Sequence, residues 1–182
     1  VWRKARLAVE ANRVRSARAA VEIVSPESSA QVKELMDSPT KYLQARATAR
    51  GKVRQELVTL ALIKLAQGDA DNAATQLDNK WSVHLSPEER NWVWGVIGKQ
   101  AAQRLSSDAV TYFGNVTKDS DLTDDLLGWK ARAALRAGQW KVVRKAVEAM
   151  GDEARRDSTW VYWHAKAVLN GKQIVVYKSG KT

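Results

Sequence analysis

Residues 129–135 read WKARAAL, and residues 163–169 read WHAKAVL. Both stretches follow the pattern Trp-x-Ala-basic-Ala-x-Leu, and each is followed within three residues by a glycine, Gly138 or Gly171. Alanine and leucine are strong helix formers, and glycine is the residue that most often ends a helix in the left-handed conformation. The two copies therefore predict a repeated unit in which a helix ends at a glycine and the chain turns back.

Tryptophans recur with the length of one helix-turn-helix repeat. Trp94, Trp129 and Trp163 stand 35 and 34 residues apart, and tetratricopeptide repeats have this period. Because the three share one repeat position, we expect them to pack in the core. Trp92 lies two residues from Trp94 and should face another direction. It is the better candidate for an exposed surface on which a ligand stacks.

Weaker copies of the unit precede these. Residues 61–77 contain a small-residue helix, Gly68 and a second alanine-rich helix, and residues 5–21 repeat this with Asn12 at the glycine position. Asparagine also adopts the left-handed conformation, so we expect Gly68, Asn12, Gly138 and Gly171 all to end helices.

Serine-proline pairs mark helix starts at Ser25, Ser38 and Ser86, and Glu89 completes a capping box with Ser86. The fold class predicted is all-α: a helical-repeat α-superhelix, similar to tetratricopeptide arrays, made of stacked antiparallel helix pairs. Helices are expected near residues 1–12, 14–24, 27–37, 40–49, 52–67, 70–79, 87–105, 107–116, 122–137, 140–149 and 154–170.

The last residues depart from the repeat. A second alanine-rich helix is expected after Gly171, but residues 172–182 contain Ile174, Val175, Val176 and Tyr177, which favour strands. We therefore predict an α-superhelical repeat domain over 1–171 and a non-helical tail over 172–182, either a natural strand or linker, or a truncation scar or engineered peptide. The first residues already read as the interior of a helix, so a processed or excised fragment is expected.

Composition narrows the function classes. The chain of 182 residues has a formal net charge of +10 and no cysteine, so a cysteine nucleophile, a disulfide and a thiolate metal site are excluded. No run approaches the length of a membrane-spanning helix, so no membrane insertion is expected. The positive charge suits an anionic partner: nucleic acid, acidic lipid or a cell-wall polymer.

The stretches GWKARAALRAGQW at residues 128–140 and WVYWHAKAVL at residues 160–169 carry a family resemblance. Their order, a glycine-terminated Trp-Ala-Arg-Ala-Leu helix, a short helix with another tryptophan and a Trp-x-Tyr-Trp helix, resembles the superhelical U domain of the soluble lytic transglycosylases. Residues 1–127 resemble that domain only in their general sequence pattern. The resemblance implies a periplasmic, peptidoglycan-remodelling parent protein whose helical domain forms an arch beside a lysozyme-like catalytic domain.

The catalytic part of such a parent is expected to be missing. The family's active domain carries a Glu-Ser pair followed by a Gly-Leu-Met-Gln stretch, and no Gly-Leu-Met-Gln occurs here. The only Glu-Ser pair, at Glu27, lies in a helix start. The resemblance thus implies a non-catalytic scaffold that helps embrace cell-wall glycan, partnered by the missing catalytic domain, while the parent cleaves the MurNAc-GlcNAc bond without hydrolysis.

No catalytic, cofactor-binding or metal-binding residues are predicted. The carboxylate pairs at Glu88 and Asp124 lie at helix starts, where negative charge is stabilised without catalysis. His84 and His164 lack ligand partners at metal-site spacing, so both are expected to be surface or packing residues.

Basic residues gather in two groups, and the candidates for contact with an anionic polymer are Arg13, Arg15 and Arg18, together with Trp92. The two groups are Arg3, Lys4, Arg6, Arg13, Arg15 and Arg18, and Lys130, Arg132, Arg136, Lys141, Arg144 and Lys145. A solvated helix face is the ordinary explanation of both groups, and contact with an anionic polymer is the more specific hypothesis. We expect weak contact with peptidoglycan; the alternatives are a free-standing tetratricopeptide-like adaptor for protein partners and a nucleic-acid binder, although no nucleic-acid motif is present.

Overall fold

The computed structural model describes the backbone of residues 1–180 and the side chains of residues 1–172. This part of the chain is helical without a strand, which confirms the all-α class. Contacts divide the chain into two compact units, unit 1 over Val1–Ile97 and unit 2 over Gly98–Thr182. Helix α7 (Pro87–Gln103) contributes residues to both units. No described helix has the length and apolar character needed to cross a membrane.

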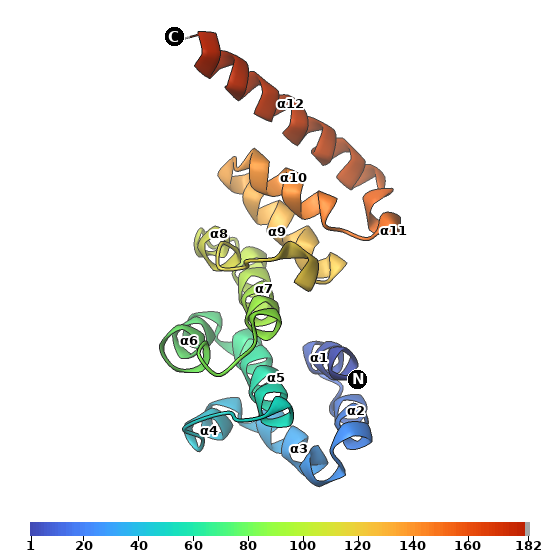
Figure 1. Ribbon diagram of the computed structural model, residues 1–182, viewed down its shortest axis with the longest axis vertical. Helices are drawn as coiled ribbons and strands as arrows, with labels where there is room; N and C mark the ends of the chain where they lie inside the picture. Colours follow the sequence, from blue (N-terminus) through green and yellow to red (C-terminus); the bar gives the residue numbers. More distant parts are fainter. Residues whose placement is uncertain (181–182) are drawn as a thin grey trace. The chain divides into compact units, whose positions relative to one another are not determined.

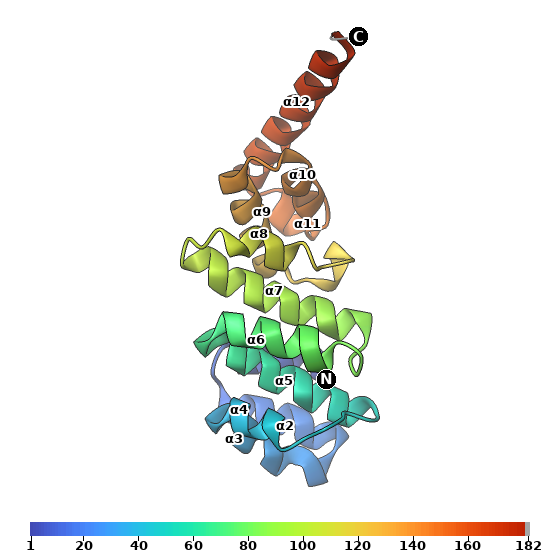
Figure 2. The same ribbon diagram turned by 90° about the vertical axis from the view of Figure 1, so that its left-hand side faces the viewer.

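Unit 1 is a succession of helices that pack on their neighbours along the chain (Figures 1 and 2). Short connections make those neighbours antiparallel, and α1 also packs against α5, which is distant in sequence. The elements are α1 (Trp2–Glu10), α2 (Val14–Val24), the 3₁₀ turn η1 (Pro26–Ser28), α3 (Ser29–Asp37), α4 (Pro39–Gln44), α5 (Lys52–Gly68), α6 (Ala70–Gln76) and the π-helical turn η2 (Leu77–Trp81).

The core of unit 1 is centred on α5. Every residue from 56 to 63 is buried, including Glu56 and Thr59. A helix buried on all sides loses the one-sided apolar stripe of a surface helix, which explains why its sequence reads as an almost continuous apolar run. The neighbours α1, α3, α4 and α6 all pack against it.

Unit 2 contains the second set of packed helices: α8 (Asp108–Phe113), the 3₁₀ turn η3 (Asp119–Asp121), α9 (Asp124–Ala137), α10 (Trp140–Glu148), α11 (Asp152–Arg155) and α12 (Ser158–Gly180). Helix α10 packs against both α9 and α12 (Figure 1). Their contact is made by Ala134, Val143 and Ala167, one from each helix. Small side chains let the three helices approach closely, as the alanine-rich sequence predicts.

Three helices end in the same left-handed turn. Asn12, Leu105 and Gly138 have φ of 58°, 58° and 69°. In each turn this residue and the next donate to two carbonyls of the last helical turn; at Gly138 the N–H of Gln139 reaches Ala134 at 2.9 Å. This pattern is a Schellman motif. The predicted ends at Asn12 and Gly138 are confirmed, and the turn at Leu105 lies 33 residues before Gly138, one repeat length.

The same prediction holds only for the helix end at Gly68, not for its left-handed conformation, and it was wrong at Gly171. Gly68 is the last residue of α5, but its φ is not positive, and the chain turns at Asp69 instead. The Asp69 carboxylate accepts a hydrogen bond from the Asn72 N–H at 3.1 Å and caps α6. Gly171 lies inside α12 and ends nothing.

The prediction of a non-helical tail was also wrong for residues 172–180, because α12 continues to Gly180. β-Branched residues lower helix propensity by only about 0.5 kcal/mol each, and adding residues to an existing helix avoids the cost of nucleation. A strand needs a partner strand, and residues 1–180 contain none. Residues 181 and 182 lie outside the described part of the chain.

The repeating tryptophans pack in the apolar interior to different depths. Trp94 is buried. Trp129 is half-buried against the cluster around Phe113, and Trp163 is half-buried against Ala134 and Val143. They fill space beside the core, as their shared repeat position predicts, although two of the three retain solvent contact.

Candidate functional site

The predicted polymer-contact arginines lie at the start of α2 in unit 1. Arg13 is the residue before α2, and Arg15 and Arg18 lie three residues apart in its first turns. The opposite side of the helix is buried through Ala17, Ala20 and Val21, so the arginines are left exposed. None of the three has an ion-pair partner among the described residues. They are therefore available to an anionic partner.

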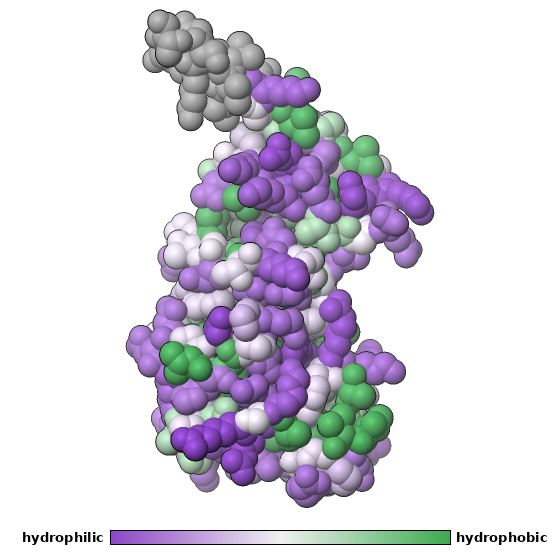
Figure 3. All heavy atoms as spheres, in the orientation of Figure 1, coloured by the Kyte–Doolittle hydropathy of each residue, from purple (hydrophilic) through white to green (hydrophobic). Residues whose placement is uncertain are grey.

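Helix α1 extends this surface. Arg3 and Lys4 are exposed and also lack an ion-pair partner within the described residues. We call Arg3, Lys4, Arg13, Arg15 and Arg18 the α1–α2 basic face. Figure 3 shows hydrophobic side chains gathered over the same two helices, and the exposed apolar residues there are Val1, Leu7, Ile23 and Val24. The surface is thus both cationic and apolar.

Arg6 was predicted to belong to this basic group, but the structure places it in the interior. It is only 2% exposed. Its guanidinium donates to the Glu56 carboxylate at 3.1 and 2.5 Å and also to Glu88. Helical spacing explains the difference, since Arg6 lies beside the buried Ala5 and Val9 on the inner side of α1.

Arg6 belongs to a buried ion cluster that the sequence did not reveal. Glu56 and Glu89 are both 0% exposed, and the Lys52 ammonium lies 2.6 Å from Glu56 and 3.3 Å from Glu89. Burial by itself lowers the pKa of Arg6, but its hydrogen bonds to Glu88 and Glu56 outweigh this and raise the pKa. Burial likewise lowers the pKa of Lys52, and its contacts with Glu56 and Glu89 raise it overall. Both cations therefore stay charged.

This cluster fixes the position of the basic face, because it joins α1 to α5 and α7 within unit 1. Two further contacts tie the α1–α2 turn to α5: Lys64 donates to the Asn12 side chain at 2.5 Å, and Gln67 donates to the Glu10 carbonyl at 2.7 Å. The helix pair that carries the exposed arginines is thus anchored by polar contacts, from buried to exposed, as well as by its apolar side.

Trp92 is not an exposed stacking surface, so that prediction was wrong. Its side chain is 1% exposed, and its indole N–H donates to the Glu10 carboxylate at 3.1 Å. The guanidinium groups of Arg3 and Arg6 lie 5.1 and 5.0 Å from its ring centre, within the range of a cation–π contact. Every residue from 91 to 97 is buried. Trp92 and Trp94 therefore face different directions, but both sides of α7 lie in the interior.

The second basic group, in unit 2, also contains both buried and exposed members. Lys130 is 8% exposed and lies 2.5 Å from Asp119. The Arg132 guanidinium lies over the rings of Trp129 and Trp160 at 4.8 and 5.2 Å. Besides Arg132, the exposed members without an ion-pair partner among residues 1–172 are Arg136, Lys141 and Lys145.

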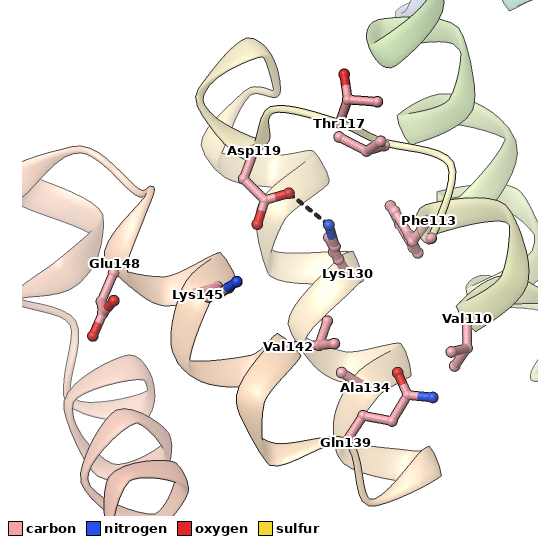
Figure 4. A pocket seen from close by; sticks show the side chains of 12 residues that line it. Val110, Phe113, Thr117, Asp119, Lys130, Ala134, Gln139, Val142, Lys145 and Glu148 are labelled. Carbon is pink, nitrogen blue, oxygen red and sulfur yellow. Dashed lines mark hydrogen bonds and ion pairs between the residues drawn. The ribbon is translucent and has the colours of Figure 1, made fainter.

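A groove in unit 2 opens beside these residues (Figure 4). It has a volume of about 460 Å³ and is lined by α8, the loop after it, α9 and α10. Val110, Val116 and Val142 supply apolar walls, and Lys145 is among the polar residues that line it. The volume falls within the range of ligand pockets, roughly 300–1,000 Å³.

The carboxylate pairs at the helix starts have structural partners. The Glu89 carboxylate accepts from the Ser86 N–H at 2.7 Å and the Ser86 hydroxyl accepts from the Glu89 N–H at 3.2 Å, which confirms the capping box. Asp124 accepts from the Gly151 N–H at 2.9 Å, and Asp125 pairs with Lys99 at 2.6 Å.

The two histidines have ordinary surroundings. His164 lies 3.0 Å from Glu148, and the His84 ring packs edge-on against Trp81. Within the described part of the chain, no three histidine or acidic side chains come together as a metal site would require.

No family model and no curated protein matches the sequence. Among solved structures, the chain is similar to an inactive mutant of the lytic transglycosylase Slt from Pseudomonas aeruginosa, with a TM-score of 0.59 and 24% sequence identity. The match covers 92% of this chain and 28% of that one, so the chain spans less than a third of the length of the enzyme it resembles. Similarity at this identity shows a shared helical fold.

Proposed function

We propose that this chain is the helical scaffold part of a lytic transglycosylase that acts on peptidoglycan in the periplasm, and that it contributes polymer binding without catalysing the reaction. The observation that carries the proposal is the fold likeness to a lytic transglycosylase over 92% of the chain. The repeated Trp-Ala-basic-Ala-Leu motif at residues 129–135 and 163–169 supports the same family independently of the fold.

The α1–α2 basic face is the proposed contact surface. Peptidoglycan carries carboxylates on its peptides, and an arginine guanidinium pairs with a carboxylate through two parallel hydrogen bonds. Arg13, Arg15 and Arg18 are exposed and unpaired within the described residues, so binding a carboxylate breaks no existing ion pair. Each exposed contact is worth at most about 1 kcal/mol, which predicts weak binding that depends on several arginines together.

The chemistry of the parent is assigned to residues outside this chain. Glycoside cleavage needs a carboxylic acid held ready to donate its proton in a cleft. Glu56 and Glu89 are fully buried in ion pairs and a cap, and Glu88 is paired with Arg6. These carboxylates already form ion pairs and a helix cap, which supports a scaffold role.

Incubation of the 182-residue chain with purified sacculi tests the proposal. We expect part of the chain to sediment with the sacculi at low salt, and we expect chromatography of the supernatant to find no anhydro-muropeptide above a no-protein control. Anhydro product would contradict the non-catalytic role. The chain could instead stay in solution with sacculi and bind nucleic acid under the same conditions. That result would mean that its ligand is a different polyanion, not peptidoglycan.

A further inference from the structure

The groove in unit 2 carries one cation that nothing in the described structure neutralises. Lys130 is satisfied by Asp119 at 2.5 Å. Lys145 is exposed and makes no ion pair with residues 1–172. Its neighbour Glu148 is occupied elsewhere, 3.0 Å from His164 and 4.0 Å from Arg144. Figure 4 shows the Lys145 ammonium directed toward the side where Asp119 and Lys130 lie, and the Glu148 carboxylate directed away. The groove therefore favours a ligand with a single negative charge.

The other residues that line the groove indicate which class of ligand fits it. A sugar ring is usually held by an exposed aromatic face, but the only aromatic side chain in the lining, Phe113, is 1% exposed. An acyl chain needs an enclosed apolar channel, whereas this groove is open and has polar groups on its walls. The Gln139 side chain is exposed and makes no hydrogen bond with the described residues. Its amide offers both a donor and an acceptor to a peptide bond.

We propose that this groove binds the C-terminal end of a short peptide. The free carboxylate pairs with the Lys145 ammonium, the last peptide bond meets the Gln139 amide, and a small apolar side chain lies between Val110 and Val142, which line the groove in Figure 4. This site is separate from the α1–α2 basic face, so peptide binding here and sacculus binding there succeed or fail independently.

Titration of the full 182-residue chain with trialanine, followed by calorimetry or by amide chemical shifts, tests the proposal. We expect dissociation constants in the millimolar range or below. The C-terminal amide of trialanine should bind about three- to fivefold more weakly, because it lacks the charge contact with the exposed Lys145 ammonium. Triglycine should bind roughly two- to fourfold more weakly, because it lacks the methyl groups that enter the apolar part.

Lys145→Ala should weaken trialanine binding by about three- to fivefold, to the level of the amide. The matched control is Lys141→Ala, which removes the same charge from an exposed position of α10 outside the groove and should change binding less than about twofold. Circular dichroism checks that both variants are folded. Absence of trialanine binding, equal binding of the acid and the amide, or equal effects of the two lysine substitutions would overturn the proposal.

Discussion

Residues 129–135 and 163–169 share the pattern Trp-x-Ala-basic-Ala-x-Leu, and a glycine follows each, yet the chain folds differently after them. After WKARAAL the helix ends at Gly138 with φ of 69° and the chain reverses into α10. After WHAKAVL the helix passes straight through Gly171 to Gly180. The residues that follow decide the outcome. Helix α10 offers Val143, Ala146 and Val147 at helical spacing, and all three are buried. The chain after Gly171 does not repeat that pattern.

A glycine therefore permits a left-handed helix end but does not impose one. Leu105 shows the converse, because it adopts the same conformation at a φ of 58° although a β-carbon disfavours it. At Leu105 the packing of α8 through Ala109 and Phe113 outweighs the preference of the turn residue. At Gly171 no separate helix follows within residues 1–180. The following predictions test this from the largest expected effect to the smallest.

Val143→Ala should destabilise the protein most. Val143 is 0% exposed between α9 and α12, and loss of two buried carbon atoms with the cavity they leave costs about 2 kcal/mol. Urea denaturation measures the change. Val161→Ala, at a position in α12 that is 54% exposed, is the control and should stay within about 0.5 kcal/mol. Equal losses of stability in the two variants would mean that the packing of α10 does not determine the turn at Gly138.

Gly138→Ala should cost about 1–2 kcal/mol, because a residue with a β-carbon is strained at positive φ. Open space surrounds the site, with no atom within 4 Å of an added β-carbon, so the cost is one of backbone conformation alone. Gly138→Asn should lose less, since asparagine already occupies the equivalent turn at Asn12. An alanine variant as stable as the parent would argue against the left-handed turn.

Leu105→Gly should stabilise unit 2 by up to about 1 kcal/mol. Relief of the left-handed strain gains about 1–2 kcal/mol, and the greater freedom of glycine in the unfolded chain offsets part of it. Little packing is lost, because Leu105 is 63% exposed. A lower denaturation midpoint in this variant would show that the leucine makes an important contact.

Gly171→Ala should have the smallest effect and the opposite sign to Gly138→Ala. Glycine inside a helix costs about 0.5–1 kcal/mol relative to alanine, and no atom lies within 4 Å of the added β-carbon. Helicity at 222 nm should rise slightly. A loss of stability would instead mean that α12 ends at Gly171, as the sequence motif alone suggests.

Sequence patterns predicted helices well because local propensity and capping agree with the packing. Asn12, Gly138 and the Ser86 capping box behave as expected. The site was harder to predict, since exposure depends on which helices surround a residue. Arg6 and Arg13 are both arginines near the turn between α1 and α2, but only the first faces Glu56, fifty positions along the chain. Glu56, directly before the apolar run that starts at Leu57, is the sequence signal from which a buried ion pair could have been predicted.

Binding of peptidoglycan by the α1–α2 basic face is tested most directly by sedimentation with purified sacculi over a series of salt concentrations. The test variant carries Arg13→Ala, Arg15→Ala and Arg18→Ala. The control carries Lys41→Ala, Arg50→Ala and Arg54→Ala, three exposed residues elsewhere in unit 1 without ion pairs among the described residues. The parent chain should sediment less as salt approaches about 0.15 M, where charges more than about 8 Å apart are screened. The test variant should lose most of its binding at low salt while the control keeps it. Equal loss in both variants, or binding that ignores salt, would contradict a role for these arginines.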